Sequence, residues 1–517
     1  MEPSASPGNT RRWATLAIAC VASLVLAIDL TVLNLAIPKL TEDLGPSATQ
    51  LLWIADVYGF ALAGLLITMG NLADRIGRRR LLLIGVAAFG AASALTAYAP
   101  NPQMLIAARA LLGVAGATIM PSTLSLVRNA FTDPAERTMA VGIWSGMGAG
   151  GFALGPVVGG TLLAHFWWGS VFLINVPLMA LIFIAGVIVL PESRNPSPAR
   201  LDLVSAVLSV AGIVAVVYAI KEAATGGIAQ TGVEAASVAG VIALALFGWR
   251  QTRLTQPLID VRLFRDRAFS GSVSSNLVAI FTMSVASLGF SLYLQLVHGW
   301  SPLIAGLAQL PGPVSAIFGG VLSAKLISLI GRARVVALGL ALCGVSFVLY
   351  GQIGLTLDYP YLVFAMLVGG MGIGLTFTVT NDTVLATVPK DRSGAASAIS
   401  ETATELGGAL GIAILGSVLT GVYRSDLRLP AGLPAEAVHG IRQSLGGALQ
   451  TGSALPPGTA SVVVHASRQA FVDGLHVTLL TSAAILGVIA VTSLFTLRGV
   501  PDVISEATGD AVLVTTP

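Results

Sequence analysis

The sequence is poor in charged and aromatic residues. Only 10% of its 517 residues are Asp, Glu, Lys or Arg and 6% are aromatic, whereas 55% are hydrophobic. Because soluble domains carry about 25% charged residues, a water-soluble fold of this size could not cover its surface with so few. Intrinsic disorder is excluded for the same reason, since disordered chains are polar and rich in charge.

Cysteine and histidine are also scarce. The two cysteines, Cys20 and Cys343, lie in apolar stretches, which excludes a disulfide scaffold and a cysteine-based metal cluster. The five histidines show no metal-ligand spacing, so we expect neither a metal nor a cofactor. The net charge of +3 is too small to indicate a nucleic-acid partner. The mean hydropathy of +0.85 instead indicates a polytopic protein of the lipid bilayer.

Apolar runs long enough to cross a membrane recur along the whole chain. A spanning helix needs about 20 mostly apolar residues. Six such runs begin between Trp13 and Gly169, two occupy 201–221 and 235–250, and six begin between Phe269 and Ala470. We therefore predict an all-α polytopic membrane protein with 14 transmembrane helices in the order 6+2+6.

Breaks between these runs divide the chain into segments. The first run is longer than the apolar part of a signal peptide and contains Asp29, so we expect it to be retained as the first helix. The predicted segments are a cytoplasmic N-terminus at 1–12, an N-terminal six-helix bundle at 13–190, linkers with an inserted helix pair at 191–268, a C-terminal six-helix bundle at 269–498 that includes an external loop at 423–467, and a cytoplasmic tail at 499–517.

The placement of Lys and Arg predicts the orientation. If the N-terminus is cytoplasmic, most of the 28 basic residues fall in cytoplasmic loops of the predicted topology. Cytoplasmic loops of membrane proteins carry this excess. We therefore expect both termini in the cytoplasm and a multi-pass location in the inner (cytoplasmic) membrane of the cell.

Five acidic residues fall within predicted spans, where a charge is costly and usually functional. Asp29 lies about two thirds of the way across its helix. Asp56 and Asp382 lie near helix ends, where an interfacial position is the alternative. Glu401 and Glu405 are four residues apart and share one helix face. Mutual repulsion and loss of water both favour a bound proton there, unless neighbouring Ser and Thr hydroxyls cap the carboxylates.

A short turn after the second run combines glycine with charge. It reads Gly70, then Asp74-Arg75, then Gly77-Arg78, followed by two more arginines. An acid among four arginines at a glycine turn predicts an ion-pair latch, and an ordinary positively charged loop is the alternative. The spacing G-x-x-x-D-R-x-G-R-R resembles the signature loop of the major facilitator superfamily.

The fifth run is rich in glycine, which lets helix backbones approach closely, and contains a kinking proline. Its G-P-x-x-G-G ending resembles the motif that marks antiporters in that superfamily. Gly155, Pro156, Gly159 and Gly160 match this ending, and Gly151, one turn earlier, is counted with the antiporter motif.

The first helix adds a more specific resemblance. Its stretch from Asp29 through Asn34 to Pro38 resembles a motif of the 14-helix drug:proton antiporter branch, and nearly the whole chain is similar to antiseptic exporters of the QacA/SmvA type. The resemblance implies the major facilitator fold. It also implies that Arg109, which could otherwise snorkel to a membrane surface, lies near the helix-1 acid, and that Glu401 is the helix-13 acid of these exporters. We therefore expect Asp29 and Glu401 to exchange protons for substrate, with Arg109 tuning Asp29. The other candidates for proton coupling or substrate binding are Glu405, Asp56, Asp382 and Asn34.

Two further patterns bear on substrate. Exporters of the branch that this chain resembles sometimes carry a further acid in helix 10, which serves divalent cations. The predicted tenth helix, 303–330, has no acid and only Lys325 as a charge, so the resemblance argues against divalent cations as substrates. Aromatic residues could line a cavity for flat cations through cation–π contacts, although interfacial belts are the commoner use of Trp and Tyr. The candidates are Trp53, Tyr58, Trp144, Phe290, Tyr293 and Phe377.

The sequence therefore predicts a transporter and not an enzyme. No H-E-x-x-H, Ser/His/Asp grouping or P-loop occurs, which argues against membrane-embedded catalysis and ATP-driven pumping. We expect a monomeric, proton-driven exporter of amphipathic, mostly cationic compounds such as quaternary ammonium antiseptics and dyes, working by alternating access. A self-resistance exporter of one antibiotic, metabolite or lipid is the alternative.

Overall fold

A computed structural model gives the architecture of the chain. It describes residues 9–46, 48–192, 202–226, 231–254, 257–258, 261–388, 393–430 and 432–501. Within those ranges the regular elements are all helical. Thirteen described helices are long and apolar enough to cross a membrane. The helix over Pro134–His165 adds a shorter apolar stretch at Leu154–His165, and its 32 residues make it about 48 Å long. The predicted all-α polytopic fold is confirmed.

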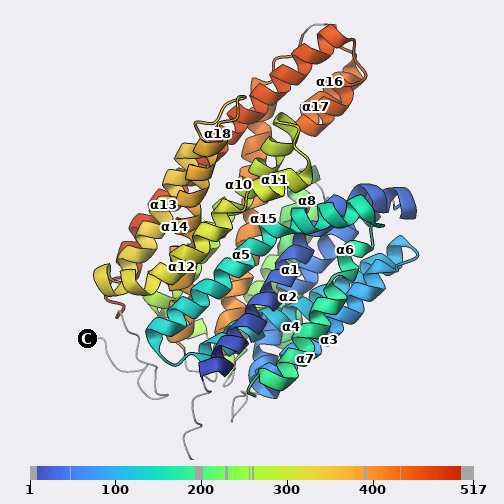
Figure 1. Cartoon of the computed structure of the whole chain (residues 1–517). Helices are drawn as coiled ribbons and strands as arrows, with labels where there is room; N and C mark the ends of the chain where they lie inside the picture. Colours follow the sequence, from blue (N-terminus) through green and yellow to red (C-terminus); the bar gives the residue numbers. More distant parts are fainter. Residues whose placement is uncertain are drawn as a thin grey trace, which may run out of the picture.

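The first group of helices forms one half of the molecule, drawn from blue to green in Figure 1. Its own apolar core includes Leu26, Leu62, Phe89 and Phe172. The helices are α1 (Asn9–Leu44), α2 (Ala48–Ile76), α3 (Arg78–Ala97), α4 (Pro102–Ala130), α5 (Pro134–His165), α6 (Ser170–Leu173) and α7 (Asn175–Val189).

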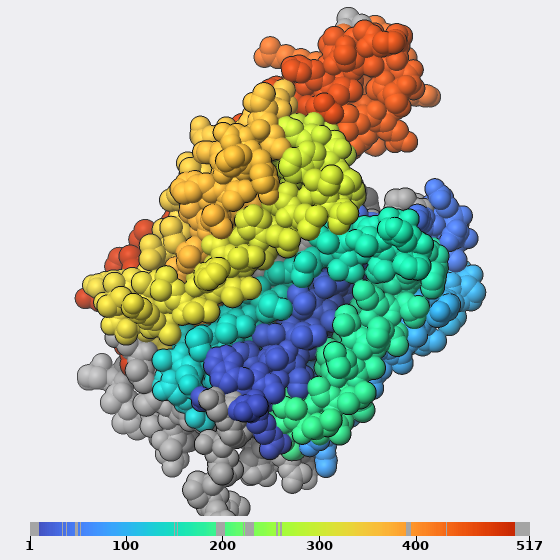
Figure 2. All heavy atoms as spheres, viewed as in Figure 1, coloured from blue at the N-terminus to red at the C-terminus, as the bar shows by residue number. Residues whose placement is uncertain are grey.

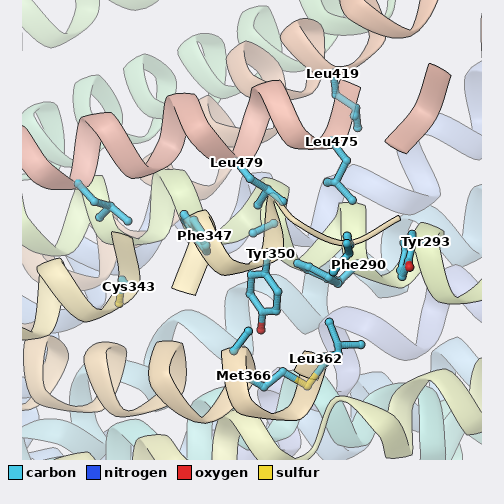
Figure 3. Close-up of a cluster of buried hydrophobic side chains, with 14 of the residues drawn as sticks. Phe290, Tyr293, Cys343, Phe347, Tyr350, Leu362, Met366, Leu419, Leu475 and Leu479 are labelled. Carbon is cyan, nitrogen blue, oxygen red and sulfur yellow. The ribbon is translucent and has the colours of Figure 1, made fainter. Parts of the chain in front are cut away.

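The last group forms the second half and has a separate core, in which Phe290, Tyr293, Phe347 and Tyr350 gather (Figure 3). Its elements are a 3-10 turn η1 (Val261–Arg265), α10 (Arg267–Leu292), a π-helical turn η2 (Tyr293–Val297), α11 (Pro302–Ala308), α12 (Pro311–Ile330), α13 (Arg332–Tyr350), α14 (Tyr359–Ala386), α15 (Ser393–Asp426), α16 (Ala435–Gln443), α17 (Leu445–Gly452) and α18 (Pro457–Thr496).

The two halves meet along two seams built from small residues. On one seam α5 runs beside α12 (Figure 1), and a Cβ added at Gly142 would lie 2.7 Å from the Cα of Gly320. On the other seam α2 meets α15, and a Cβ added at Gly70 would lie 2.6 Å from the Cβ of Ala398. Glycine at these positions lets backbones of opposite halves touch.

A pair of helices, α8 (Leu203–Gly226) and α9 (Thr231–Arg253), lies between the halves in sequence. The α8 helix covers the α2–α15 seam, because Ile213 and Val217 share an apolar cluster with Phe60 and Ala403. The α9 helix packs on α8 and leaves a broad apolar face exposed. Arg250 pairs with Asp202 at 2.7 Å and holds the pKa of that carboxyl well below its usual range, which ties the two helices together.

The end of the molecule that the sequence predicts to be cytoplasmic has the same turn in both halves. Gly77 (φ +110°) and Gly331 (φ +82°) each precede a helix, and each is followed by a buried arginine, Arg78 or Arg332. Positive φ favours glycine at both places. Arg332 also reaches the carbonyl of Pro501 at 3.1 Å, so the described C-terminus lies at this end.

The external loop predicted at 423–467 is largely helical. The α16 and α17 helices stand beyond the rest of the molecule on the long ends of α15 and α18 (Figure 2). Ile441, Ala448 and Val463 are fully buried and continue the apolar core of the C-terminal half into this projection. The Tyr423 hydroxyl donates to the carbonyl of Ile441 at 2.7 Å and fastens this projection to α15.

Candidate functional site

Asp29, the predicted helix-1 acid, is buried and fully paired in the N-terminal half. Its side chain has no exposed surface. Arg109 of α4 donates to Oδ2 at 3.2 Å, and the amide of Asn175 on α7 donates to Oδ1 at 2.8 Å. Asn175 also reaches the hydroxyl of Ser93 on α3 at 3.3 Å. Four helices therefore fix this carboxylate.

Arg109 lies in the interior and does not snorkel, since it is 1% exposed. Its Nε donates to the carbonyl of Ile54 on α2 at 3.3 Å. The ring of Tyr58 lies 4.7 Å from its guanidinium carbon, and the ring of Phe172 lies 5.8 Å from it. Such cation–π contacts stabilise a desolvated guanidinium, so the ion pair with Asp29 is enclosed on several sides.

Glu401 is also buried, at 8% exposed, but its surroundings are different. Among the residues that the structure describes, no Lys or Arg forms an ion pair with it, and the charged group that acts on it is Glu405, one turn along α15. Glu405 is half-buried. A buried carboxylate without a cation is costly, so this site favours a bound proton or a positively charged ligand.

The hydroxyls beside Glu401 do not cap its carboxylate in the described structure. Thr402 donates to the carbonyl of Ala398 at 2.7 Å, and Thr404 donates to the carbonyl of Ser400 at 3.0 Å. The Ser400 hydroxyl donates to Asn381 at 2.9 Å. A hydroxyl has a single proton to give, so these three donors are already used.

A buried amide network that the sequence did not indicate lies beside Glu401. The amide of Asn276 on α10 donates to Asn381 on α14 at 2.8 Å and to Ser400 on α15 at 3.1 Å. Thr380 donates to the Asn276 carbonyl oxygen. The network joins three helices of the C-terminal half at the residue that precedes Glu401, and so it fixes the position of that part of α15.

Asp382 does not join Glu401 but ties the two halves together at the predicted cytoplasmic end. It accepts from Arg137 of α5 at 2.7 Å and from Arg332 of α13 at 2.8 Å. Thr138 adds a hydrogen bond at 3.1 Å. The carboxylate has no exposed surface, so Asp382 is an enclosed, paired charge and not a solvated one. Two paired arginines favour its charged form.

Asp74 makes a second tie between the halves. Arg78 donates to it at 2.8 Å, and the backbone N–H groups of Gly394 and Ala395 at the start of α15 donate at 3.2 Å. A carboxylate at a helix N-terminus is stabilised by the helix dipole. Arg75, the third residue of the predicted latch, is exposed and takes no described part in it.

The α5 glycines face two different neighbours. Added Cβ atoms at Gly151 and Gly159 would meet α1, at 2.5 Å from Ala27 and 3.1 Å from Leu35. Gly155 faces Thr31 of α1, and Gly160 faces Leu303 of α11 in the other half. The motif therefore lets α5 pack tightly between its own half and the opposite one.

The predicted cavity aromatics are dispersed. Phe290 and Tyr293 belong to the C-terminal core (Figure 3), and Phe377 packs at its edge. Trp144 is buried in a cluster of α1, α4 and α5. Trp53 stacks on Tyr218 of α8, with 6.4 Å between the two ring centroids. Among the contacts that the structure describes, Tyr58 is the one of the six aromatics that touches an ionic group of the site, the guanidinium of Arg109.

Asp56, Asn34 and the expected absence of a metal site remain among the predicted features. Asp56 is half-buried on α2, near its predicted outer end. The side chain of Asn34 lies outside what the structure describes. In the described part of the chain no three His, Cys, Asp or Glu side chains are grouped so as to hold a metal ion.

Comparison with known proteins gives one family and several relatives. Residues 19–412 match the model of the Major Facilitator Superfamily. The chain is 43% identical to the multidrug efflux pump LfrA of Mycolicibacterium smegmatis, over 94% of this chain and 98% of LfrA. It is 36% identical to the methyl viologen resistance protein SmvA of Salmonella typhimurium, over 94% of this chain and 98% of SmvA.

Two further comparisons extend this result. The chain is 32% identical to the tetracenomycin C resistance and export protein of Streptomyces glaucescens, over 95% of this chain and 93% of that protein. Its fold matches the crystal structure of the human organic anion transporter MFSD10 with a TM-score of 0.58 and 13% identity, over 92% and 99% of the two chains.

Proposed function

Because the chain belongs to the major facilitator superfamily, and its relatives are efflux pumps and resistance exporters, we propose that it is a proton-driven antiporter. It exports amphipathic, mostly cationic compounds across the cytoplasmic membrane. Protons moving inward drive the export, and the working unit is a monomer. The observation that carries the proposal is the buried carboxyl of Glu401, which has a second carboxyl one turn away and no described cation paired with it.

The exchange step follows from the charge of this site. A protonated glutamate pair is neutral and tolerates burial, whereas the deprotonated pair needs a positive partner. A drug cation that enters from the cytoplasm supplies this partner and displaces the proton into the cytoplasmic water. On the outer side a proton replaces the drug. Proton and drug therefore compete for one negative charge, which is what antiport requires.

Alternating access requires two units that move against each other. We assign these units to 13–190 and 269–498. The helix pair α8–α9 lies outside both bundles. The described conformation is tied at the predicted cytoplasmic end by Asp74 to α15 and by Asp382 to Arg137. Opening toward the cytoplasm breaks both ties, and closure restores them. Asp29 and Arg109 keep a fixed charge pair within the moving N-terminal unit.

The test is ethidium transport in inverted membrane vesicles with a pH gradient imposed or collapsed. We expect ethidium uptake that depends on the gradient and stops when an ionophore collapses it. Uptake that is unchanged without a gradient contradicts proton coupling. A gradient of sodium at constant pH serves as the control and should drive no uptake.

A second candidate is a self-resistance exporter of one antibiotic or metabolite. The relationship to the tetracenomycin C exporter over 95% of this chain favours it. A resistance panel separates the two candidates, because a multidrug exporter protects cells against ethidium, quaternary ammonium compounds and unrelated dyes together. Protection against one antibiotic, with none against these cations, would support the single-substrate exporter.

A further inference from the structure

A closed set of hydrogen bonds joins three helices of the C-terminal half. The amide of Asn276 on α10 donates to the side-chain oxygen of Asn381 on α14 at 2.8 Å and to the hydroxyl of Ser400 on α15 at 3.1 Å. The Ser400 hydroxyl donates to the same oxygen of Asn381 at 2.9 Å, which closes the circuit. Each of the three residues is at most 4% exposed.

The orientation of Asn276 is fixed, because Thr380 donates to its carbonyl oxygen. An asparagine amide has two hydrogens to give, and both are used, one on Asn381 and one on Ser400. Buried polar groups that satisfy one another in this way make the helices that carry them rigid relative to each other. These four residues are called the amide network below.

Close packing of the helices does not require the amide network. Cβ atoms added at Gly407 and Gly411 of α15 would lie 2.5 and 2.0 Å from the backbone carbonyl oxygens of Leu277 and Phe281 on α10. Glycine therefore already brings these two backbones together. Apolar side chains of the same shape could replace a buried polar set at little cost in stability. They would not fix the register of the three helices, whereas hydrogen bonds form only at one relative position.

The amide network adjoins both of the groups on which the proposed transport cycle depends. On α15, Ser400 directly precedes Glu401. On α14, Asn381 directly precedes Asp382, which accepts from Arg137 of the opposite half at 2.7 Å. Neighbouring residues of a helix move together, because the helix backbone is held by its own hydrogen bonds. The network therefore fixes the part of α15 that carries Glu401 relative to the tie between the halves.

The proposed antiport requires a link between these two groups. The carrier must open toward the cytoplasm when Glu401 holds a proton and close that end when it holds a drug, so the Arg137–Asp382 tie must respond to the occupant. A drug cation is much larger than a proton, and a close-packed interior cannot hold both with α15 in one place. A displacement of α15 at Glu401 reaches α14 through the hydrogen bonds of Ser400.

We propose that the amide network is the positioning element that couples the occupant of Glu401 to the tie between Arg137 and Asp382. The inference rests on the proposed antiport and states how its two steps are joined. The network carries no proton itself, because the proton released at Glu401 passes to water and the amide and hydroxyl groups keep theirs throughout. Breaking the network should therefore spare proton exchange and remove its effect on the conformation.

The test is Ser400→Ala with two readouts on the purified, full-length protein at one pH. Spin labels at the exposed positions Ala135 on α5 and Arg334 on α13 report the ratio of closed to open forms at the predicted cytoplasmic end. A pH dye reports the protons that ethidium releases. In the wild type we expect saturating ethidium to raise the ratio by about 5- to 150-fold, the usual range of coupling between sites. In Ser400→Ala the change should fall below this range, while proton release stays at the wild-type level.

Matched variants separate coupling from stability. Ser346→Ala is the control, since this buried hydroxyl also joins two helices of the C-terminal half, donating to the carbonyl of Ala365 at 2.8 Å, and its loss should leave both readouts unchanged. Ser400→Thr keeps a hydroxyl and should restore the conformational response. Thr380→Val removes the donor to Asn276 with almost the same shape. It should weaken the response in the same way, which keeps the test open if Ser400→Ala does not fold.

A double variant identifies the far end of the link. Arg137→Gln removes the tie between the halves, while Asp382 keeps Arg332 at 2.8 Å. If the amide network acts through this tie, Ser400→Ala changes the response no further in the Arg137→Gln background. A further change there, or a wild-type response in Ser400→Ala alone, overturns the inference. Loss of proton release together with the response, in both Ser400→Ala and Thr380→Val, also overturns it, because the network would then only maintain the fold.

The two readouts keep this inference apart from the proposed function. Ethidium-induced release from the wild type, with an unaltered conformational response in Ser400→Ala, contradicts only the role of the amide network. No release from the wild type at any pH contradicts the proposed antiport, and with it the inference.

Discussion

The two halves of the molecule each bury an acid, but they pair it differently. In the N-terminal half, Asp29 has a cation at 3.2 Å and an amide donor at 2.8 Å. In the C-terminal half, Glu401 has a second carboxyl, Glu405, as its charged neighbour and no described ion pair. Both carboxyls are shielded from water, so the contrast arises from their partners and not from the degree of burial.

In the antiport that we propose, this difference separates a structural charge from an exchangeable one. A buried ion pair is costly to break, because removal of one partner leaves the other charge uncompensated. A buried carboxyl without a cation gains a proton or a cationic ligand at little cost. Asp74 and Asp382, which are paired with Arg78 and Arg137 respectively, belong with Asp29 in the first class. Glu401 represents the second.

The largest expected effect comes from removing the cation of the N-terminal pair. Arg109→Ala leaves Asp29 buried without its cation, so that the carboxyl either stays an uncompensated charge or takes up a proton in a site built around an ion pair, and we expect a loss of about 3–5 kcal/mol in stability against unfolding. Thermal or denaturant unfolding of the purified protein in detergent measures it. Adding Asp29→Asn to Arg109→Ala should recover a large part of the loss, because no unpaired charge then remains. Equal instability of the single and double variants contradicts the structural assignment of Asp29.

The second prediction converts the C-terminal site into a copy of the N-terminal one. Glu405→Lys places a cation one turn from Glu401 on the same helix face. The attraction between the two charges amounts to about 3 kcal/mol at an effective dielectric constant near 20. Glu401 then stays charged, so ethidium export driven by a pH gradient should fall by about a hundredfold.

Glu405→Gln is the matched control for that variant. It removes the second acid without supplying a cation, so Glu401 can still take up and release a proton. We expect it to retain most of the gradient-driven export. If Glu405→Lys exports ethidium as well as Glu405→Gln does, the pairing of Glu401 is irrelevant to transport.

The smallest expected effect concerns a paired acid at the seam. Asp74→Asn weakens the tie to Arg78 and to the first N–H groups of α15. We expect the balance of conformational states to shift by about 1–3 kcal/mol toward opening at the predicted cytoplasmic end, with ethidium-induced proton release retained. Distance distributions between spin labels on α2 and α15 measure the balance. Unchanged populations contradict a role for this tie.

The sequence predicted more of the fold than of the contacts between the side chains of the candidate site. Hydropathy alone predicted the helical spans, because a bilayer requires a minimum apolar length. The helix-1 and helix-4 motifs placed Asp29 near Arg109 only through the family resemblance. Asn175, which completes the pair, carried no signal of its own, since a single asparagine in an apolar run does not indicate its partner.

Contacts between distant helices account for most of what the sequence did not predict. The arginines that hold Asp382 lie 245 and 50 residues away from it, and no spacing rule connects them. The network of Asn276, Asn381 and Ser400 joins three helices in the same way. Phe290 and Tyr293 were candidates for a cavity, but their helix face turns into the C-terminal core (Figure 3).

The central claim is that drug binding displaces a proton from Glu401 and not from Asp29. It is tested most directly by ethidium-induced proton release from purified wild-type protein, Glu401→Gln and Asp29→Asn at one pH. We predict release from the wild type and from Asp29→Asn, and none from Glu401→Gln. Release from Glu401→Gln at the wild-type level, or its loss only in Asp29→Asn, would contradict the account.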